Sequence, residues 1–175
     1  MRKSIYITGI AGSGKSTLVK TFNTMGYEAY DIENDVYGLF MMVRKDTGER
    51  FMDYDNTDPE KVKNARWLCD VDKLKALIDR QNNEVAFYCG IASDNKKIMK
   101  LFNQSFVLKV DPEELNNRLL VREGTDDYAN TEAGRKRVLA GKDEFENDMV
   151  QAGMTIIDAT TDDKRVATEI INLIG

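Results

Sequence analysis

The residues with the clearest chemical signature lie near the amino end, where glycines and small residues lead into a Gly-Lys-Ser-Thr sequence. This segment matches the complete pattern G-x-x-x-x-G-K-[ST]. Glycines let the backbone bend so that successive N–H groups converge on phosphate oxygens, and a helix starting directly afterwards adds a positive partial charge. The predicted phosphate-binding residues are Gly9, Ala11, Gly12, Ser13, Gly14, Lys15, Ser16 and Thr17.

Lys15 and Ser16 are the charged and metal-binding members of this loop. A lysine in this position reaches the β- and γ-phosphates, and the hydroxyl that follows it can ligate Mg²⁺. The motif follows an apolar run and opens a helical stretch, which is the context it requires. ATP and Mg²⁺ are therefore the expected cofactors, while the loop leaves the reaction open.

Two classes of nucleotide-hydrolysing protein lack their other motifs here. A GTPase would carry Asn-Lys-x-Asp to read guanine, whereas residues 95–98 read Asn-Lys-Lys-Ile. A motor-type ATPase would carry adjacent acids at the end of a strand, whereas residues 87–90 read Phe-Tyr-Cys-Gly. Both classes are disfavoured.

A second chemical group, Asp31, Glu33 and Asp35, follows the next apolar run. The carboxyl ends of parallel strands converge on one crevice, so these acids should face the phosphates. The alternative is that Glu33 and Asp35 only favour the start of a following helix. The sequence has no histidine, so acid–base chemistry falls to carboxylates, lysine, tyrosine or cysteine.

Five short apolar runs predict buried strands, and helical segments separate them. Such alternation is typical of an α/β protein with a parallel sheet covered by helices on both faces. At 175 residues the chain has the size of one domain, so we expect a single domain over residues 1–175. The predicted strands are 4–8, 27–31, 85–89, 106–110 and 155–158.

The second and third of these strands are separated by roughly fifty residues, too many for one plain crossover helix. Within this stretch Trp67, Val71, Leu74 and Ile78 recur at helical spacing. The spacing predicts a long helix inside 59–81 that packs this stripe inward. Trp67 is expected in the core rather than as a platform for a ligand.

Bulk composition excludes several partners and locations. A net charge of −5 and a pI near 4.9 argue against a chain that coats nucleic acid or an anionic membrane. No apolar run is long enough for a signal peptide or a membrane span, so a cytoplasmic protein is expected. Cys69 and Cys89 lack metal-site or disulfide spacing and are expected as buried thiols. The chain should be a monomer or a homodimer.

A third chemical feature, after the phosphate loop and the acids of Asp31-Ile32-Glu33, is an arginine-rich segment. Arg118 and Arg122 stand four residues apart, Asp126-Asp127 follow, and further arginines enter the next helical segment. With these features the chain resembles the nucleoside monophosphate kinase and shikimate kinase group over nearly its whole length. The resemblance implies a three-layer P-loop NTPase fold with a five-stranded parallel sheet in the order 2-3-1-4-5. It also implies an acceptor-binding insert at about 36–82 and a lid at about 123–134.

The resemblance further assigns roles to single residues. Asp31 joins Ser16 on the magnesium side, and Glu33 faces the hydroxyl of the acceptor. Arg118, Asp158 and Thr160 are implied as further nucleotide-binding positions. The alternative for the arginines is that they are solvated helix charges. The implied catalytic residues are Lys15, Asp31, Glu33, Arg118, Arg122 and Arg137.

The function implied by the resemblance is transfer of the γ-phosphoryl group of ATP to a small-molecule acceptor, with a nucleoside monophosphate preferred. Arg44, Arg50 and Arg66 lie in the insert and could hold the acceptor's phosphate. They would equally suit the carboxylate of a hydroxylated metabolite such as shikimate. A third alternative is a regulatory ATPase without a small acceptor, because the acids expected after the third strand are missing.

Overall fold

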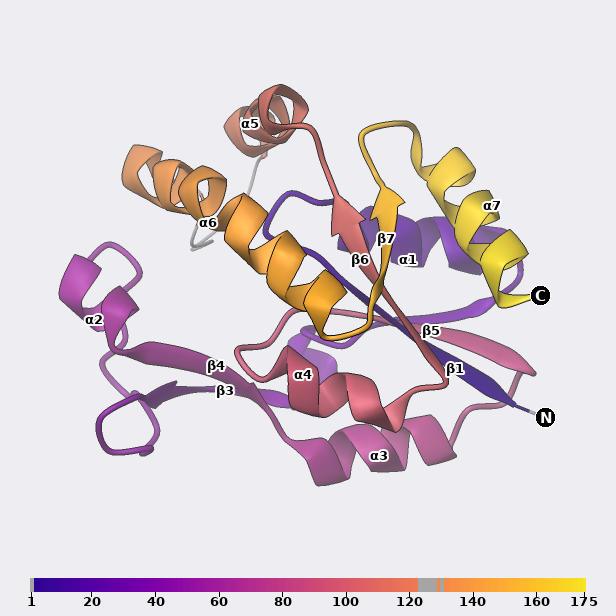
Figure 1. Ribbon diagram of the computed structural model, residues 1–175. Helices are drawn as coiled ribbons and strands as arrows, with labels where there is room; N and C mark the ends of the chain where they lie inside the picture. Colours follow the sequence, from indigo (N-terminus) through magenta and orange to yellow (C-terminus); the bar gives the residue numbers. More distant parts are fainter. Residues whose placement is uncertain (1, 123–128, 130) are drawn as a thin grey trace.

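A computed structural model of the chain describes residues 2–122, 129 and 131–175. Seven strands and seven α-helices lie in these ranges, with short 3-10 turns at Asp35–Tyr37 and Met99–Leu101 (Figure 1). The strands are β1 (Lys3–Thr8), β2 (Glu28–Asp31), β3 (Phe40–Arg44), β4 (Ala65–Cys69), β5 (Val85–Cys89), β6 (Gln104–Lys109) and β7 (Thr155–Asp158). The helices are α1 (Lys15–Thr24), α2 (Pro59–Lys63), α3 (Val71–Asp79), α4 (Asn95–Ile98), α5 (Pro112–Val121), α6 (Glu132–Gln151) and α7 (Asp163–Ile174).

The main sheet has five strands in the order β2-β5-β1-β6-β7, and every pair in it is parallel. Counted along the chain, these are the second, third, first, fourth and fifth strands of the sheet. The predicted order 2-3-1-4-5 and the α/β class are therefore confirmed. The labels differ only because β3 and β4 form a separate sheet between the second and third strands.

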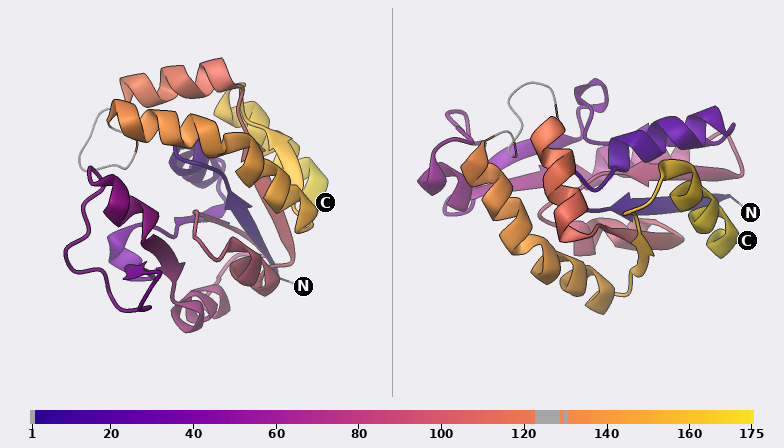
Figure 2. Two further views of the ribbon diagram at one scale, coloured as in Figure 1. Left: turned by 60° about the vertical axis from the view of Figure 1, so that its left-hand side comes forward. Right: turned by 90° about the horizontal axis from the view of Figure 1, so that it is seen from above.

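Alternate side chains of the central strands enter two cores, one on each face of the sheet. Ile5 and Ile7 pack with residues of α1 and α7, whereas Tyr6 and Tyr88 pack with residues of α3 and α4. This follows from the two-residue period of a strand, because both faces of a parallel sheet are covered by helices. The helices lie on either side of the sheet in Figures 1 and 2, which gives the three layers.

The helices that follow β6 and β7 start where side-chain chemistry predicts. Asp111 precedes α5, and its Oδ1 accepts a hydrogen bond from the backbone N–H of Glu113 at 3.0 Å, with Pro112 as the first helical residue. Asp162 precedes α7 and accepts from Lys164 N at 3.0 Å. These caps satisfy N–H groups that a helix leaves open at its start.

The long helix predicted within 59–81 is wrong. The structure has the short helix α2, then strand β4, and then helix α3, which Asp70 caps by accepting from Lys73 N at 3.1 Å. β4 pairs antiparallel with β3, with Trp67 opposite Met42. The helical spacing between Trp67 and the residues of α3 is coincidental. The extended backbone conformation of residues 65–69 is fixed by pairing with the distant strand β3.

The part of the insert around α2 lies beside the first half of α6 (Figure 2). Arg137 Nη2 donates to the backbone oxygen of Asn56 at 3.3 Å and so joins the two segments. Most of the predicted lid, 123–128 and residue 130, lies outside the described residues. At its end, Thr131 Oγ1 accepts from Gly134 N at 2.9 Å and caps α6.

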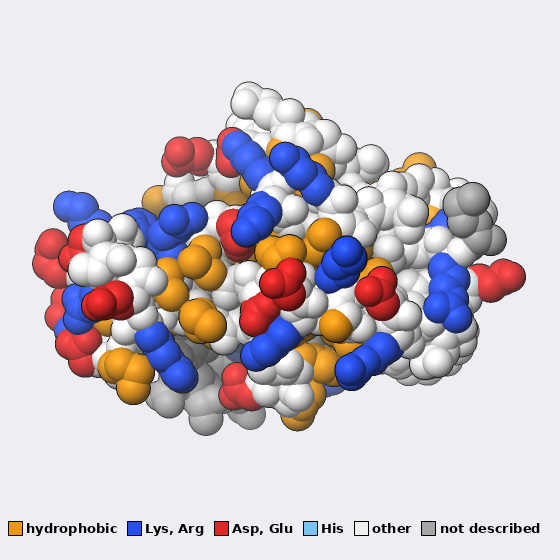
Figure 3. Space-filling view, turned by 90° about the horizontal axis from the view of Figure 1, so that it is seen from below, with side chains coloured by type: hydrophobic (Ala, Val, Ile, Leu, Met, Phe, Trp, Pro, Cys, Tyr) orange, Lys and Arg blue, Asp and Glu red, His pale blue; other side chains and the backbone are white. Residues whose placement is uncertain are grey.

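The surface on the side of α3 and α4 mixes acidic and basic side chains among small apolar areas (Figure 3). Both cysteines are buried free thiols, as predicted, and burial raises the pKa of Cys69 to about 12. Among the helices that the structure describes, none combines the length and apolar composition needed to cross a membrane.

Candidate active site

The phosphate loop joins the end of β1 to the start of α1, as predicted. At Gly9 an added Cβ would come within 2.4 Å of Ser13 Oγ, so a residue with a side chain would clash with Ser13. Gly14 has φ 101° and precedes the first residue of α1, a left-handed conformation that favours glycine. The open backbone and the helix start fit a bound phosphate group.

Lys15 lies folded over this loop. Its Nζ donates to the backbone oxygens of Gly9 at 2.6 Å and Ile10 at 3.2 Å. Burial lowers the pKa of Lys15, and the nearby carboxylate of Glu33 opposes that shift. Because these acceptors are neutral carbonyl oxygens, the Lys15 ammonium is suited to stabilise the charge of a phosphate group in their place.

The two predicted magnesium ligands lie side by side. Ser16 Oγ, at the start of α1, donates to Asp31 Oδ2, at the end of β2, at 2.7 Å. The described part of the chain holds no group of three or more His, Cys, Asp or Glu side chains that could bind a metal. A serine hydroxyl and one acid still fit Mg²⁺, because Mg²⁺ in nucleotide sites takes most ligands from phosphates and water.

Glu33 is held by two N–H donors. Its Oε1 accepts from the indole Nε1 of Trp67 at 3.2 Å, and its Oε2 accepts from the backbone N–H of Ile91 at 3.1 Å. Burial raises the pKa of Glu33, while the charge of Lys15 and these hydrogen bonds act in the opposite direction. A carboxylate oriented in this way beside Lys15 is a candidate acid–base group. The alternative role at a helix start fits Asp35, which is the acid in the first turn of Asp35–Tyr37, whereas Glu33 precedes the Asn34 cap of that turn.

Arg118 holds the loop between β7 and α7. Its Nε donates to Glu114 at 2.7 Å, and its Nη2 donates to the backbone oxygens of Ala159 at 2.9 Å and Thr160 at 3.2 Å. Its Nη1 also lies 3.7 Å from where a Cβ on Gly14 would stand. This geometry fits the predicted nucleotide-side role, in which the guanidinium connects the two loops.

Asp158 and Thr160 shape the same loop. Thr160 lines the cavity described below, whereas Asp158 is not among the described lining residues. The Asp158 carboxylate instead accepts from Thr160 N at 3.0 Å, and these bonds lower its pKa. Asp158 thus positions the backbone of this loop, and its predicted nucleotide-binding role stays a prediction.

A cavity of about 1560 Å³ runs from the phosphate loop to the insert, and Arg122 and Arg137 line it. Arg122 follows the last residue of α5, and its charge acts on Lys15. Cavities that hold small ligands are commonly about 300–1,000 Å³. The space is thus large enough for a nucleotide and a second small molecule.

Several cavity residues were not predicted as site residues. Trp67, expected in the core, is half-buried and lines the cavity, and its ring stacks on Phe40 with centroids 5.3 Å apart. Asp94 and Asn95 follow β5 and also line it. The rule that the carboxyl ends of parallel strands converge could have found the latter two. Trp67 could not be found in this way, because its position depends on the β3–β4 pairing.

Comparison with known proteins agrees with this geometry. The profile of a protein family described as an AAA domain matches residues 5–138. Among solved structures, the shikimate kinase of Bacteroides thetaiotaomicron aligns with a TM-score of 0.63 at 15% identity, covering 98% of each chain. The deoxyadenosine kinase of M. mycoides with bound dATP aligns with a TM-score of 0.57 at 16% identity, covering 99% of each chain.

A gluconokinase of Sinorhizobium meliloti also aligns, with a TM-score of 0.52 at 17% identity, covering 98% of this chain and 92% of that chain. The search of curated protein sequences found no significant match. The structural likenesses show a shared fold, while the family match spans most of the chain. The chain therefore belongs to this AAA domain family of P-loop proteins, and its fold is that of the small P-loop kinases.

Proposed function

We propose that the protein is a phosphotransferase that moves the γ-phosphoryl group of ATP to a hydroxyl group of a small molecule. The observation that carries this proposal is the continuous cavity of about 1560 Å³, which joins the phosphate loop to a space lined by the insert. A protein that only hydrolyses ATP needs no second ligand pocket. The kinases with the same fold support the proposal as likenesses of architecture.

In this proposal the residues of the site have separate roles in phosphoryl transfer. MgATP would supply the phosphoryl group. Lys15 and Arg122 stabilise the negative charge that spreads over the transferred group, and Ser16 with Asp31 holds the metal side. Glu33 orients the acceptor hydroxyl and receives its proton, and the two N–H donors on its carboxylate fix its orientation and keep it ionised.

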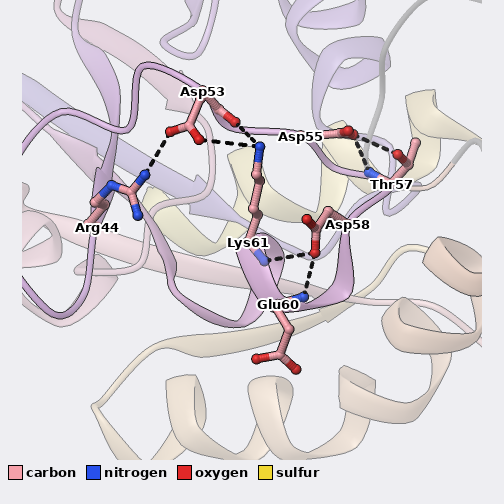
Figure 4. Close-up of polar contacts among 7 residues, drawn as sticks. All are labelled: Arg44, Asp53, Asp55, Thr57, Asp58, Glu60 and Lys61. Carbon is pink, nitrogen blue, oxygen red and sulfur yellow. Dashed lines mark hydrogen bonds and ion pairs between the residues drawn. The ribbon is translucent and has the colours of Figure 1, made fainter.

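The three insert arginines do not support the preference for a nucleoside monophosphate, which came from the resemblance. None of Arg44, Arg50 and Arg66 is among the described residues that line the cavity. Arg44 Nη2 instead lies 2.7 Å from Asp53 Oδ1 (Figure 4). The shikimate-like alternative used the same arginines for a carboxylate and loses support in the same way. The proposed acceptor is therefore defined by its hydroxyl group alone.

The raised pKa of Glu33 predicts how turnover depends on pH. Because the ionised carboxylate is the form that accepts a proton, kcat/KM should rise with pH and reach half its maximum above pH 4.3, about the ordinary pKa of glutamate. Trp67→Phe removes an N–H that lowers the pKa of Glu33, so this acid limb should move to higher pH. Phe40→Leu, which removes the stacked ring but no hydrogen bond, should leave the limb in place. A Trp67→Phe limb that stays at the wild-type position would show that Glu33 is not the titrating group.

Ser16→Ala tests the metal side. The Ser16 hydroxyl can ligate Mg²⁺, and its loss should weaken ATP binding in the presence of Mg²⁺ while leaving metal-free ATP binding almost unchanged. Isothermal titration with and without the metal measures both affinities. Thr24→Ala, an exposed hydroxyl at the end of α1, serves as the control. An equal loss of affinity in both conditions would contradict a metal role for Ser16.

The proposal as a whole is tested by measuring ADP release across nucleosides, nucleoside monophosphates, sugars and hydroxy acids. A phosphotransferase should show release that rises sharply with at least one acceptor. Slow ATP turnover that no acceptor accelerates would favour the regulatory ATPase and overturn the proposal.

A further inference from the structure

The chemistry of the cavity wall identifies the class of acceptor, an inference that rests on the proposed phosphoryl transfer. We call the part of the cavity lined by the β3–β4 sheet, the 91–96 loop and the last half of α6 the acceptor pocket. Met42, Ala65 and Trp67 line it from the insert, and Phe145 and Met149 line it from α6. Apolar side chains on two facing elements favour a ligand with an apolar ring over a fully polar chain.

The basic residues of the insert do not reach this pocket. Arg44 lies over the Phe51 ring, 4.1 Å from its centroid, and pairs with Asp53. Lys61 also pairs with Asp53, and its Nζ donates to the Asp53 backbone oxygen at 2.7 Å (Figure 4). Arg66 alternates away from Trp67 along β4 and is exposed. The insert therefore offers no described guanidinium for an anionic acceptor.

Carboxylates outnumber cations among the described charged residues of the acceptor pocket, with Glu33, Asp94 and Asp148 against Lys96. Lys96 is neutralised by Asp148, with Nζ and Oδ1 2.6 Å apart. Arg137 lies in the first half of α6, outside the acceptor pocket, and donates to a backbone oxygen of the insert. Glu33 and Asp94 contribute carboxylates from the neighbouring strand ends. A phosphate or carboxylate on the acceptor would lie near these acids, and juxtaposed like charges disfavour binding.

The carboxylate of Asp94 favours a ligand that carries a hydrogen-bond donor. Its Oδ1 is buried and accepts no hydrogen bond from the described residues. The Asp94 side chain also makes no cap bond at the start of α4, although the residue stands in the capping position. A buried hydrogen-bond acceptor without a donor is destabilising. An N–H or O–H group on a ligand would remove that destabilisation.

We infer that the acceptor is an uncharged, flat-ring compound that carries N–H donors and a hydroxyl group, which is the chemistry of a nucleoside. Its ring lies between Trp67 and the α6 side chains, and its donor group meets Asp94. The hydroxyl oxygen forms a bond to the γ-phosphorus of ATP while the bond from that phosphorus to the β–γ bridging oxygen breaks, leaving its electron pair on ADP. The hydroxyl proton passes to Glu33 and then to solvent.

Binding can be read from the protein itself, because Trp67 is the single tryptophan of the sequence and lines the acceptor pocket. With ADP saturating the nucleotide side, titration with purine and pyrimidine nucleosides should change Trp67 emission saturably. The matching 5′-monophosphates and shikimate should not do so at the same concentrations. In steady state, kcat/KM with ATP should favour the best nucleoside over its monophosphate by about 10²-fold.

Asp94→Asn provides the matched variant, since it keeps the shape and removes the charge. It should reduce the preference for the nucleoside over its monophosphate by about tenfold. Arg66→Ala, an exposed insert arginine outside the pocket, should leave that preference unchanged. The inference would be overturned if monophosphates or hydroxy acids were phosphorylated faster than nucleosides. It would also be overturned if Asp94→Asn kept the wild-type preference. Either result would still support the proposed phosphoryl transfer. Failure of every acceptor would overturn the proposed function, and the inference with it.

Discussion

Lys15→Ala should reduce phosphoryl transfer by about 10³-fold, because one preorganised positive charge at developing phosphate charge is typically worth about 10²–10³-fold in rate. Among its described hydrogen-bond partners, the Lys15 ammonium contacts only backbone oxygens of its own loop. Burial disfavours the charged form of Lys15 and lowers its pKa. The substitution should therefore leave the melting temperature unchanged or slightly higher. Single-turnover kinetics with saturating ATP, together with thermal unfolding, measures both quantities.

Lys20→Ala is the matched control for this experiment. Lys20 belongs to the same helix α1 and is exposed, so its loss should change neither the rate nor the stability. Near-normal turnover in Lys15→Ala would remove the catalytic role of the phosphate loop. A large fall in melting temperature would show instead that the lysine is a structural residue.

Arg122→Ala should lower kcat and kcat/KM together by about 10²-fold, with little change in KM, if the guanidinium acts on the transition state. Arg122 lines the cavity, and its charge already acts on Lys15 across the loop. It follows the last turn of α5 and is exposed. The free energy of unfolding should therefore change by no more than about 0.5 kcal/mol.

The control for Arg122 is Arg80→Ala. Arg80 stands in the same position after the last residue of α3, is exposed, and is absent from the described lining of the cavity. It should have no effect on kcat. If Arg122→Ala behaved like Arg80→Ala, the residue would be a solvated helix charge, which is the alternative that its sequence also allows.

Local sequence signals were sufficient to predict the elements that position the phosphates. The apolar run before Gly9 and the glycine pattern of the loop specify strand, turn and helix within a few residues of one another. The pair Ser16 and Asp31 could also be predicted, because parallel strands end at one edge of the sheet. Such features depend on short-range chemistry and on a general rule of topology.

The acceptor side could not be predicted in the same way. Trp67 was expected on a helix because the spacing to Val71 and Leu74 is helical, yet its backbone is fixed by pairing with β3, some twenty-five residues earlier. The direction of Arg44 depends on Asp53 and Phe51, which a linear pattern does not connect to it. Side-chain direction in the insert is thus a tertiary property, and Arg44, one of the expected phosphate-binding arginines, points to other partners.

The central claim, transfer to a small molecule, is tested most directly by following the γ-phosphoryl group of labelled ATP. The wild-type protein is incubated with each acceptor and Mg²⁺, with Lys15→Ala as the blank, and the products are separated by mass. The account predicts that the label appears in one phosphorylated acceptor, in step with ADP formation, and that the blank forms none. Label found only in inorganic phosphate, whatever the acceptor, would contradict it.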